Sequence, residues 1–369
     1  MTGSAGKVRY AVVGLGYIAQ VAVLPAFRNA RRNSQLAALV SGDPEKLRGL
    51  GRRYGVEHLY SYERYAECLA NVDAVYIALP NHLHHSYALA AARAGVHVLC
   101  EKPLAVSVEQ CREMIGEARR HDVRLMTAYR LHFDRATMRA LEIAGEGRLG
   151  DPRVFHSAFT MQVKPGNIRL GPEALGGGPV YDLGVYCINA ARHLFASEPE
   201  RVQACSRSGG DLRFSQSHEA LAATMAFQDG RLASFTVSNG AEKRGWYELI
   251  GTHGWLRMSP SYDYAAPIVL EVEIDGRRRK SRYGRRDQFA PELLAFSASV
   301  LAGRDPESSG AEGLADLRVV EALLESARRG ESVDLPPFDG GARLDENQAI
   351  HRPPVERPEL LHAHAPGAS

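Results

Sequence analysis

Short apolar runs alternate with helical patterns along the first third of the chain. The apolar runs cover residues 7–13, 35–41, 74–79, 96–100 and 123–128. Between them, residues 44–55, 84–94 and 107–121 have the composition, spacing or caps of helices. Strands that are apolar throughout are typical of a parallel sheet covered by helices on both faces. The pattern predicts a doubly wound α/β domain over residues 1–130.

The pattern changes after Tyr129. Short strands with period-two alternation are predicted at 154–163, 220–227, 231–238, 246–250, 255–258 and 268–274. Helices are predicted at 133–145, 179–195, 291–302 and 313–329. These elements predict an α+β domain over residues 131–335, with a mostly antiparallel sheet and helices on one face only. We expect the other face to be apolar and open, which is typical of the interface of a homodimer or homotetramer.

Composition narrows the possible partners and surroundings. The formal net charge is only +2, so no electrostatic case for nucleic-acid binding arises. No apolar run is long enough to span a bilayer. The five cysteines form no CxxC pair and no secretory segment precedes the first strand, so we expect a cytoplasmic protein with free thiols. Residues 336–369 are rich in proline, charge and small residues, and we expect a tail that is disordered or peripherally docked.

A glycine turn joins the first strand to the first helix. Gly14, Gly16 and Ala19 form a GxGxxA motif, with Tyr17 and Ile18 inside it. The first glycine permits the tight turn, the second lets a pyrophosphate approach the backbone, and the alanine allows close packing. Free N–H groups at the helix start favour an anion. The motif in this context predicts a Rossmann dinucleotide site.

The end of the second strand bears on the choice of cofactor. NAD-specific folds place an acid there to bind the ribose 2′-hydroxyl, whereas this chain has Ser41 and Gly42. A hydroxyl and a glycine accept a 2′-phosphate, and Lys46 is in reach to pair with it or is an exposed helix lysine. Asp43 is evidence for NAD instead. If the strand end is aligned two positions later, Asp43 takes the place of the acid that binds the ribose 2′-hydroxyl. We expect NADP rather than NAD.

Several motifs together resemble the Gfo/Idh/MocA family, and its glucose–fructose oxidoreductase branch in particular. They are GLGYIA at 14–19, PNHLHH at 80–85, CEKP at 100–103 and GGGPVYDLGVYCIN at 176–189. The resemblance implies that Lys102 is catalytic and that the Lys102–Pro103 bond is cis. It also implies that the loop with Leu79, Pro80, Asn81 and His84, together with Glu101, lies beside the cofactor.

The resemblance also assigns roles in the second domain. Asp182 and Tyr186 stand four apart on a predicted helix and therefore share one face. The branch uses this tyrosine for proton exchange with the sugar hydroxyl, and Asp182 orients the sugar and Lys102. Arg130 is a candidate for the carboxamide or for sugar oxygens, or is a structural interdomain residue, and Arg169 is a weaker substrate candidate. No acid or cysteine stands near His82, His84 and His85 at usable spacing, so no metal is predicted.

These observations predict an NADP-dependent sugar oxidoreductase, acting as an aldose dehydrogenase or as a glucose–fructose or aldose oxidoreductase. An inositol or polyol dehydrogenase of the same family is the alternative. A histidine at position 186 would favour that function, but this chain has a tyrosine there. A non-catalytic NAD(P)-binding regulator is a further alternative. Intact Lys102, Asp182 and Tyr186 argue against it.

Overall fold

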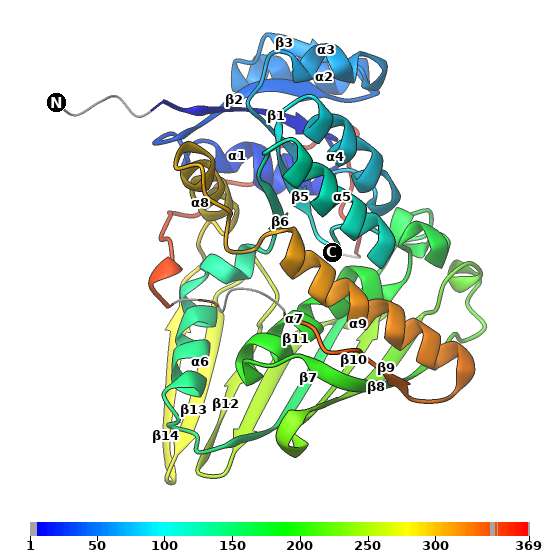
Figure 1. Cartoon of the computed structure of the whole chain (residues 1–369), viewed down its shortest axis with the longest axis vertical. Coiled ribbons are helices and arrows are strands. Elements are labelled where there is room, and N and C mark those ends of the chain that lie inside the picture. Colours follow the sequence, from blue (N-terminus) through cyan, green and yellow to red (C-terminus); the bar gives the residue numbers. More distant parts are fainter. Residues whose placement is uncertain (1–5, 340–343, 345, 368–369) are drawn as a thin grey trace, which may run out of the picture.

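Two sheets, one above the other, organise the chain (Figure 1). The computed structural model describes residues 6–339, 344 and 346–367. The first five residues of the predicted first domain, and residues 340–343, 345, 368 and 369 of the predicted tail, lie outside the described part. Figure 1 places the N-terminal sheet at the top, the second sheet at the bottom, and helix α9 between them.

The N-terminal sheet has six strands, all parallel, in the order β3-β2-β1-β4-β5-β6. Its strands are β1 (Val8–Val13), β2 (Ser34–Val40), β3 (His58–Tyr60), β4 (Ala74–Ile77), β5 (His97–Glu101) and β6 (Leu125–Ala128). Its helices are η1 (Ala19–Val23), α1 (Leu24–Ala26), α2 (Pro44–Tyr54), α3 (Tyr65–Leu69), α4 (His84–Arg93) and α5 (Val108–Arg120). The predicted Rossmann sheet is confirmed.

Two apolar cores cover the two faces of this sheet. Val13 and Ile77 face α3, α4 and α5, whereas Tyr10 and Tyr76 face η1 and helix α8 (Phe289–Leu301). The sequence places α8 with the second domain, but the helix contacts β1 and β2. The Tyr10 hydroxyl lies 2.7 Å from Ser297 Oγ, which ties α8 to the first strand. A helix distant in sequence therefore completes the Rossmann domain.

The second sheet has nine strands in the order β14-β13-β12-β11-β7-β10-β9-β8-β15. They are β7 (Pro152–Gln162), β8 (Pro199–Arg207), β9 (Ala220–Phe227), β10 (Leu232–Ser238), β11 (Gly240–Gly251), β12 (Gly254–Met258), β13 (Ile268–Ile274), β14 (Arg277–Tyr283) and β15 (Val333–Asp334). All neighbours run antiparallel except β7 and β10, which are parallel. The mostly antiparallel prediction is confirmed.

Three helices pack on one face of the second sheet. They are α6 (Arg135–Gly145), α7 (Val185–Phe195), which continues the π-helical turn η7 (Val180–Gly184), and α9 (Gly310–Arg329). Helix α9 also contacts α5 and β6, so it joins the domains. The opposite face is uncovered in the described chain, but it mixes apolar and polar side chains, including Leu232 beside His156 and Ser234. The expectation of an apolar face therefore holds only in part.

The strands that sequence patterns missed lack a continuous apolar signal. Strand β14 reads RRRKSRY and lies at an exposed edge, where no side chain needs to be buried. Strand β8 alternates, with Val202 and Ala204 buried and Arg201 and Gln203 exposed, but its polar residues hide the pattern. Strand β3 and helix α3 are too short to show a period. No helix in the described ranges is both long and apolar enough to cross a membrane.

Candidate active site

The glycine turn has the geometry that a dinucleotide site requires. Gly14 has φ +93°, and a Cβ there would lie 2.6 Å from the carbonyl oxygen of Ala78, so only glycine fits. A Cβ at Gly16 would meet no other described atom within 4 Å, which leaves that side of the turn open to a ligand. Ala19 is buried at the start of η1, as the motif predicts. The turn therefore offers a close, open backbone approach for a pyrophosphate.

The Lys102 ammonium lies at the carboxyl end of β5 and reaches into the second domain. Its peptide bond to Pro103 is cis, as the resemblance implies. Lys102 Nζ donates to the Asp182 carbonyl oxygen at 2.7 Å and to its carboxylate at 3.1 Å, and lies 4.6 Å from the centre of the Tyr186 ring. The predicted catalytic residues Lys102, Asp182 and Tyr186 therefore meet, although 80 residues separate the lysine from the aspartate.

Charges around Asp182 fix the protonation of this cluster. Burial alone would raise the pKa of Asp182, but the Arg169 guanidinium and the Lys102 ammonium hold it far below its usual range. Arg169 Nε donates to the other carboxylate oxygen at 2.5 Å. Burial alone would lower the pKa of Lys102, whereas Tyr186, Asp182 and Glu101 raise it overall. At neutral pH the cluster therefore holds a carboxylate between two cations.

Arg130 holds Tyr186 from the other side. It donates to the Tyr186 hydroxyl at 3.3 Å, to the Tyr262 carbonyl oxygen at 2.6 Å and to the Gln288 side chain. Its guanidinium carbon lies 5.2 Å from the centre of the Tyr186 ring. The Tyr186 hydroxyl is thus placed beside an arginine and near a lysine, in a position to exchange a proton with a substrate hydroxyl.

Models of known families match most of the chain. The oxidoreductase family with an NAD-binding Rossmann fold matches residues 8–129, and the Gfo/Idh/MocA C-terminal domain matches residues 137–257. An uncharacterised oxidoreductase from Rhizobium meliloti is 34% identical across 88% of this chain and 98% of its own length. This chain belongs to the Gfo/Idh/MocA oxidoreductase family.

Other Gfo/Idh/MocA relatives have sugar-related names. An NADP(+) D-xylose 1-dehydrogenase from Haloarcula marismortui is 29% identical over 90% of this chain and 95% of its own. The crystal structure of an aldose–aldose oxidoreductase from Caulobacter crescentus, solved with glycerol, is 35% identical and superposes with a TM-score of 0.85. It covers 89% of this chain and 100% of that one. Like these relatives, this chain is an oxidoreductase, and in its structure Lys102 contacts both Asp182 and Tyr186.

Two residues predicted to bind the cofactor, His84 and Asn81, make contacts within the protein. His84 is fully buried, and its ring nitrogens lie 2.9 Å from the carbonyl oxygens of Pro103 and Leu79, so the side chain is not available to a ligand. The prediction that His84 binds the cofactor is therefore corrected, because the ring joins the third-strand loop to the cis-proline loop. Asn81 donates to the Gly176 carbonyl oxygen at 2.8 Å and fastens that loop to the second domain.

Ser41, Asp43 and Lys46, the residues that bear on the choice of cofactor, lie at the end of β2 and the start of α2. Ser41 is buried, and its hydroxyl accepts from the Asp43 N–H at 3.2 Å. Asp43 caps α2 by accepting from the N–H groups of Glu45 and Lys46 at 2.9 and 3.1 Å. One oxygen of its carboxylate is thus committed to the helix start, whereas the Lys46 side chain makes no hydrogen bond to any described residue.

Three supporting residues carried no sequence signal. Gln288 and Tyr262 hold Arg130, and Glu292 lies buried near Glu101. Burial raises the pKa of Glu101 and of Glu292, and repulsion from Glu101 raises that of Glu292 further. All three come from segments more than 100 residues away from their partners, so no local pattern marks them.

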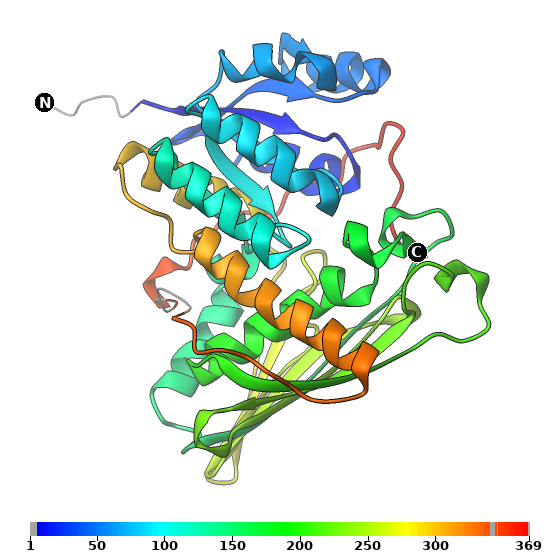
Figure 2. The same ribbon diagram turned by 45° about the vertical axis from the view of Figure 1, so that its right-hand side comes forward.

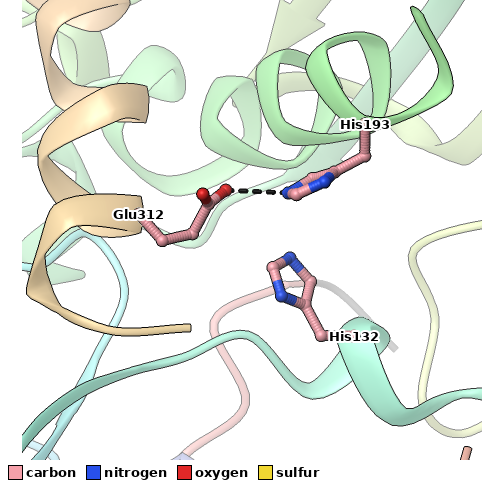
Figure 3. A group of neighbouring side chains, drawn as sticks. All are labelled: His132, His193 and Glu312. Carbon is pink, nitrogen blue, oxygen red and sulfur yellow. Dashed lines mark hydrogen bonds and ion pairs between the residues drawn. The ribbon is translucent and has the colours of Figure 1, made fainter. Parts of the chain in front are cut away.

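A second polar cluster lies further along α7 (Figure 3). His132, His193 and Glu312 place their ligand-type atoms within 4.8 Å of one another, an arrangement that also suits a metal ion. One oxygen of Glu312 accepts from His193 at 2.8 Å, from Arg192 at 2.7 Å and from Asn189 at 2.9 Å. A cation there would compete with the guanidinium, so we assign this cluster to the junction between domains.

Proposed function

We propose that this protein is an NADP-dependent sugar oxidoreductase that moves hydride between a sugar hydroxyl carbon, in the leading case C1 of an aldose, and the nicotinamide. The observation that carries the proposal is the meeting of Lys102, Asp182 and Tyr186 at the carboxyl edge of the Rossmann sheet. Ligands of this fold bind at that edge. The names of the xylose dehydrogenase and aldose–aldose oxidoreductase relatives support a sugar substrate.

The residues of the glycine turn and of the β2 end fit a dinucleotide. Gly14 and Gly16 leave the backbone open, with Tyr17, Ile18, Leu79, Pro80 and Glu101 around the turn and the strand ends. When bound, the nicotinamide supplies the hydride acceptor or donor. Ser41, Gly42 and Lys46 would hold the 2′-phosphate. A ketoreductase from Actinomadura kijaniata, 29% identical with a TM-score of 0.79 over 87% of this chain and 98% of its own, was solved with NADP.

The protein side of the reaction falls to three groups. Tyr186 would exchange the proton of the sugar hydroxyl, and the Lys102 ammonium would stabilise negative charge that develops on the same oxygen. Asp182 stays ionised between Lys102 and Arg169, and so would orient the lysine. Arg130 would position Tyr186 rather than contact the sugar, because its donors already have partners.

The first experiment is the absorbance at 340 nm of the purified protein, supplied with NADP, after addition of glucose or xylose, with myo-inositol in parallel. A rise with an aldose supports the proposal, whereas a rise with inositol alone supports the polyol alternative. No rise with any sugar or polyol, in a protein that binds NADP, would show a regulator. The Lys102→Met variant serves as the control for a signal that depends on this site.

A Lys46→Ala variant tests the choice of cofactor. We expect KM for NADP to rise about tenfold, because one exposed charge-assisted contact to the 2′-phosphate is lost. KM for NAD, which lacks that phosphate, should stay the same. Steady-state rates with each nucleotide measure the effect, and an equal change for both nucleotides contradicts the 2′-phosphate assignment.

The uncovered face of the second sheet is proposed to pair with a second copy of the chain in a dimer or tetramer. Leu232 and Ile250 are exposed on this face, in a surface that mixes apolar and polar residues. Light scattering coupled to gel filtration tests this. A strictly monomeric protein contradicts it.

A further inference from the structure

The C-terminal tail is anchored first at the junction of the two domains. Gln348 donates to the His132 carbonyl oxygen at 2.7 Å, and the Ile350 N–H donates to that of Phe133 at 3.2 Å. Arg352 then donates to the Asn29 carbonyl oxygen at 3.1 Å, and the Asn29 side chain donates to that of Pro353 at 2.9 Å. The chain thus reaches the Rossmann domain beside its first helix.

From there the tail crosses the elements that bind the dinucleotide. Arg357 donates to the hydroxyl of Tyr17, in the glycine turn, at 3.4 Å. The Gln20 amide and the backbone of Leu361 exchange two hydrogen bonds of 2.8 Å. Leu361 packs on α2 so closely that a Cβ at Gly49 would lie 2.5 Å from its Cδ1. Polar and apolar contacts together define the docking.

The tail next reaches the ribose end of the site. His362 adopts a left-handed conformation, with φ +45°, and turns its ring toward the start of α2. Its Nδ1 lies 2.8 Å from the Asp43 carboxylate, and its Nε2 lies 3.3 Å from that of Glu45. Without this contact, the second carboxylate oxygen of Asp43 would have no cationic partner next to Ser41 and Gly42. The histidine engages the one acid that opposes a 2′-phosphate there.

The tail finally returns to the second domain. The Lys164 N–H donates to the Pro366 carbonyl oxygen at 2.9 Å, and Gly367 forms a bridge with Val163 at the end of β7. Figure 2 shows this red segment running from the Rossmann domain down to the second domain. Residues 355–367 thus bridge the two domains on the side of the glycine turn and the start of α2.

We propose that residues 355–367 form a strap that closes over the bound nicotinamide dinucleotide and slows its release. The inference rests on the proposed function, because it requires the dinucleotide to lie between the glycine turn and Ser41, as it does in this fold. The strap contacts both ends of that path, through Arg357 and His362, and is held at the second domain. A nucleotide that leaves must first break these contacts.

The length of one relative is consistent with the strap being an additional segment of this chain. The aldose–aldose oxidoreductase is covered over 100% of its length by 89% of this chain. Part of this chain therefore has no counterpart in that enzyme, and the tail from Pro336 to the C-terminus is long enough to account for most of it. An enzyme that retains NADPH between two sugar half-reactions gains from such a strap, whereas a dehydrogenase that exchanges it each turnover does not.

The test is the NADPH dissociation rate, measured by stopped-flow fluorescence on displacement with excess NADP. The intact chain is compared with a chain that ends at Pro354, which keeps the anchors at His132 and Asn29. We expect truncation to raise the rate about tenfold or more, since changes in affinity among variants fall mainly on dissociation. An unchanged rate overturns the strap.

A Gly49→Glu variant displaces the strap without altering the tail. The new side chain would collide with Leu361, while a helix interior favours glutamate over glycine, so folding is protected. Gly116→Glu on α5 is the matched control, because a Cβ there has only an ordinary 3.7 Å contact with Arg120. The strap is supported if Gly49→Glu releases NADPH faster and Gly116→Glu releases it at the normal rate. It also requires that Gly49→Glu has no added effect on release in the truncated chain. Faster release in both glutamate variants overturns it.

The two proposals fail in different ways. An intact chain that binds no dinucleotide overturns both the strap and the proposed function. A chain that binds NADPH but shows no change at 340 nm with any sugar overturns the proposed function alone. In that case the dissociation rates of the intact and truncated chains still decide whether the strap exists.

Discussion

Two polar clusters lie one after the other along the same helical segment, η7 and α7, and they differ in how many of their charged groups are buried and paired. In one cluster, Lys102 and Asp182 keep 11% and 14% of their side chains exposed, and the Tyr186 hydroxyl has a single arginine contact at 3.3 Å. In the other cluster, Arg192 and Glu312 are each 3% exposed. The open cluster is suited to chemistry and the sealed one to holding the domains together.

The difference lies in the number of partners as well as in burial. Arg192 donates to Glu198, to Glu312 and to Asp316, so its donors are saturated. A cavity of about 30 Å³ is lined by Tyr186 and His193 among others, so residues of both clusters border it. It has room for about one water molecule. Similar residue types therefore have different roles in the two clusters. The role depends on whether a hydrogen-bond donor is left without a protein partner and can bind a ligand.

The largest effect is expected from Lys102→Met. We expect kcat/KM to fall by about 10³-fold or more, because the charge that stabilises a developing alkoxide is lost. Folding should be retained, since Asp182 still pairs with Arg169. Rates with the sugar that gives the 340 nm signal, and thermal unfolding, measure the two effects. Lys280→Met, at an exposed edge strand, is the control. A normal rate in a folded Lys102→Met protein contradicts the catalytic assignment.

The cluster around Arg192 should respond in the opposite way to mutation, with a large loss of stability and activity close to normal. Arg192→Met leaves three acids, Glu198, Glu312 and Asp316, without their cation in a buried setting. We expect a loss of about 3–5 kcal/mol in the free energy of unfolding. Urea denaturation measures it.

A matched surface pair provides the control for Arg192→Met. Arg201→Met removes an exposed ion pair with Asp334 and should cost less than about 1 kcal/mol. The activity of the Arg192→Met molecules that remain folded should be close to normal. Equal losses of stability in the two variants would remove the distinction between the sealed cluster and a surface pair.

Tyr186→Phe sharpens the comparison within the open cluster. It removes only the hydroxyl and keeps the ring, which packs against Phe159 and Tyr262. We expect kcat to fall about 10²-fold, as for loss of a general acid or base, with little change in stability. Tyr181→Phe, on the same segment, removes a hydroxyl that donates to the Val106 carbonyl oxygen at 3.0 Å and should leave kcat near normal. Similar losses of kcat in both would argue for a structural role.

The smallest expected effect is a pH dependence of stability through His132. Burial alone would lower the pKa of His132, but Glu307, Glu312 and the Asn189 contact raise it above its usual value. A raised pKa in the folded state stabilises the protein below the unfolded pKa of about 6.5, and this stabilisation is lost as pH rises through the folded pKa. We expect the free energy of unfolding to fall across that rise in pH.

His132→Gln is the variant that tests this pH dependence. The side chain of glutamine does not titrate, so the fall in unfolding free energy above about pH 6.5 should become shallower than in the parent protein. Urea denaturation at a series of pH values from about 5 to about 9 gives both curves. Parallel curves would mean that His132 does not cause the pH dependence.

Local signals predicted much of the open cluster. Apolar runs and glycine turns identify the Rossmann sheet, and Ser107 caps a helix as a short-range rule requires. The spacing of Asp182 and Tyr186 places both on one face of a helix, and GxGxxA and EKP lie at strand ends. Each of these features depends on a few neighbouring residues, so the sequence alone contains it.

The sequence by itself thus determined the two-sheet architecture, the glycine turn and which side chains were candidates for the active site. Only the tertiary structure decided that His84 is buried between two loops, that Arg192 meets Glu312 across 120 residues, and that Leu361 docks on Gln20 across 341. Periodicity and caps act over a few positions, because they depend on backbone geometry. Partners of buried polar groups depend on which elements pack together, and no local pattern encodes that choice.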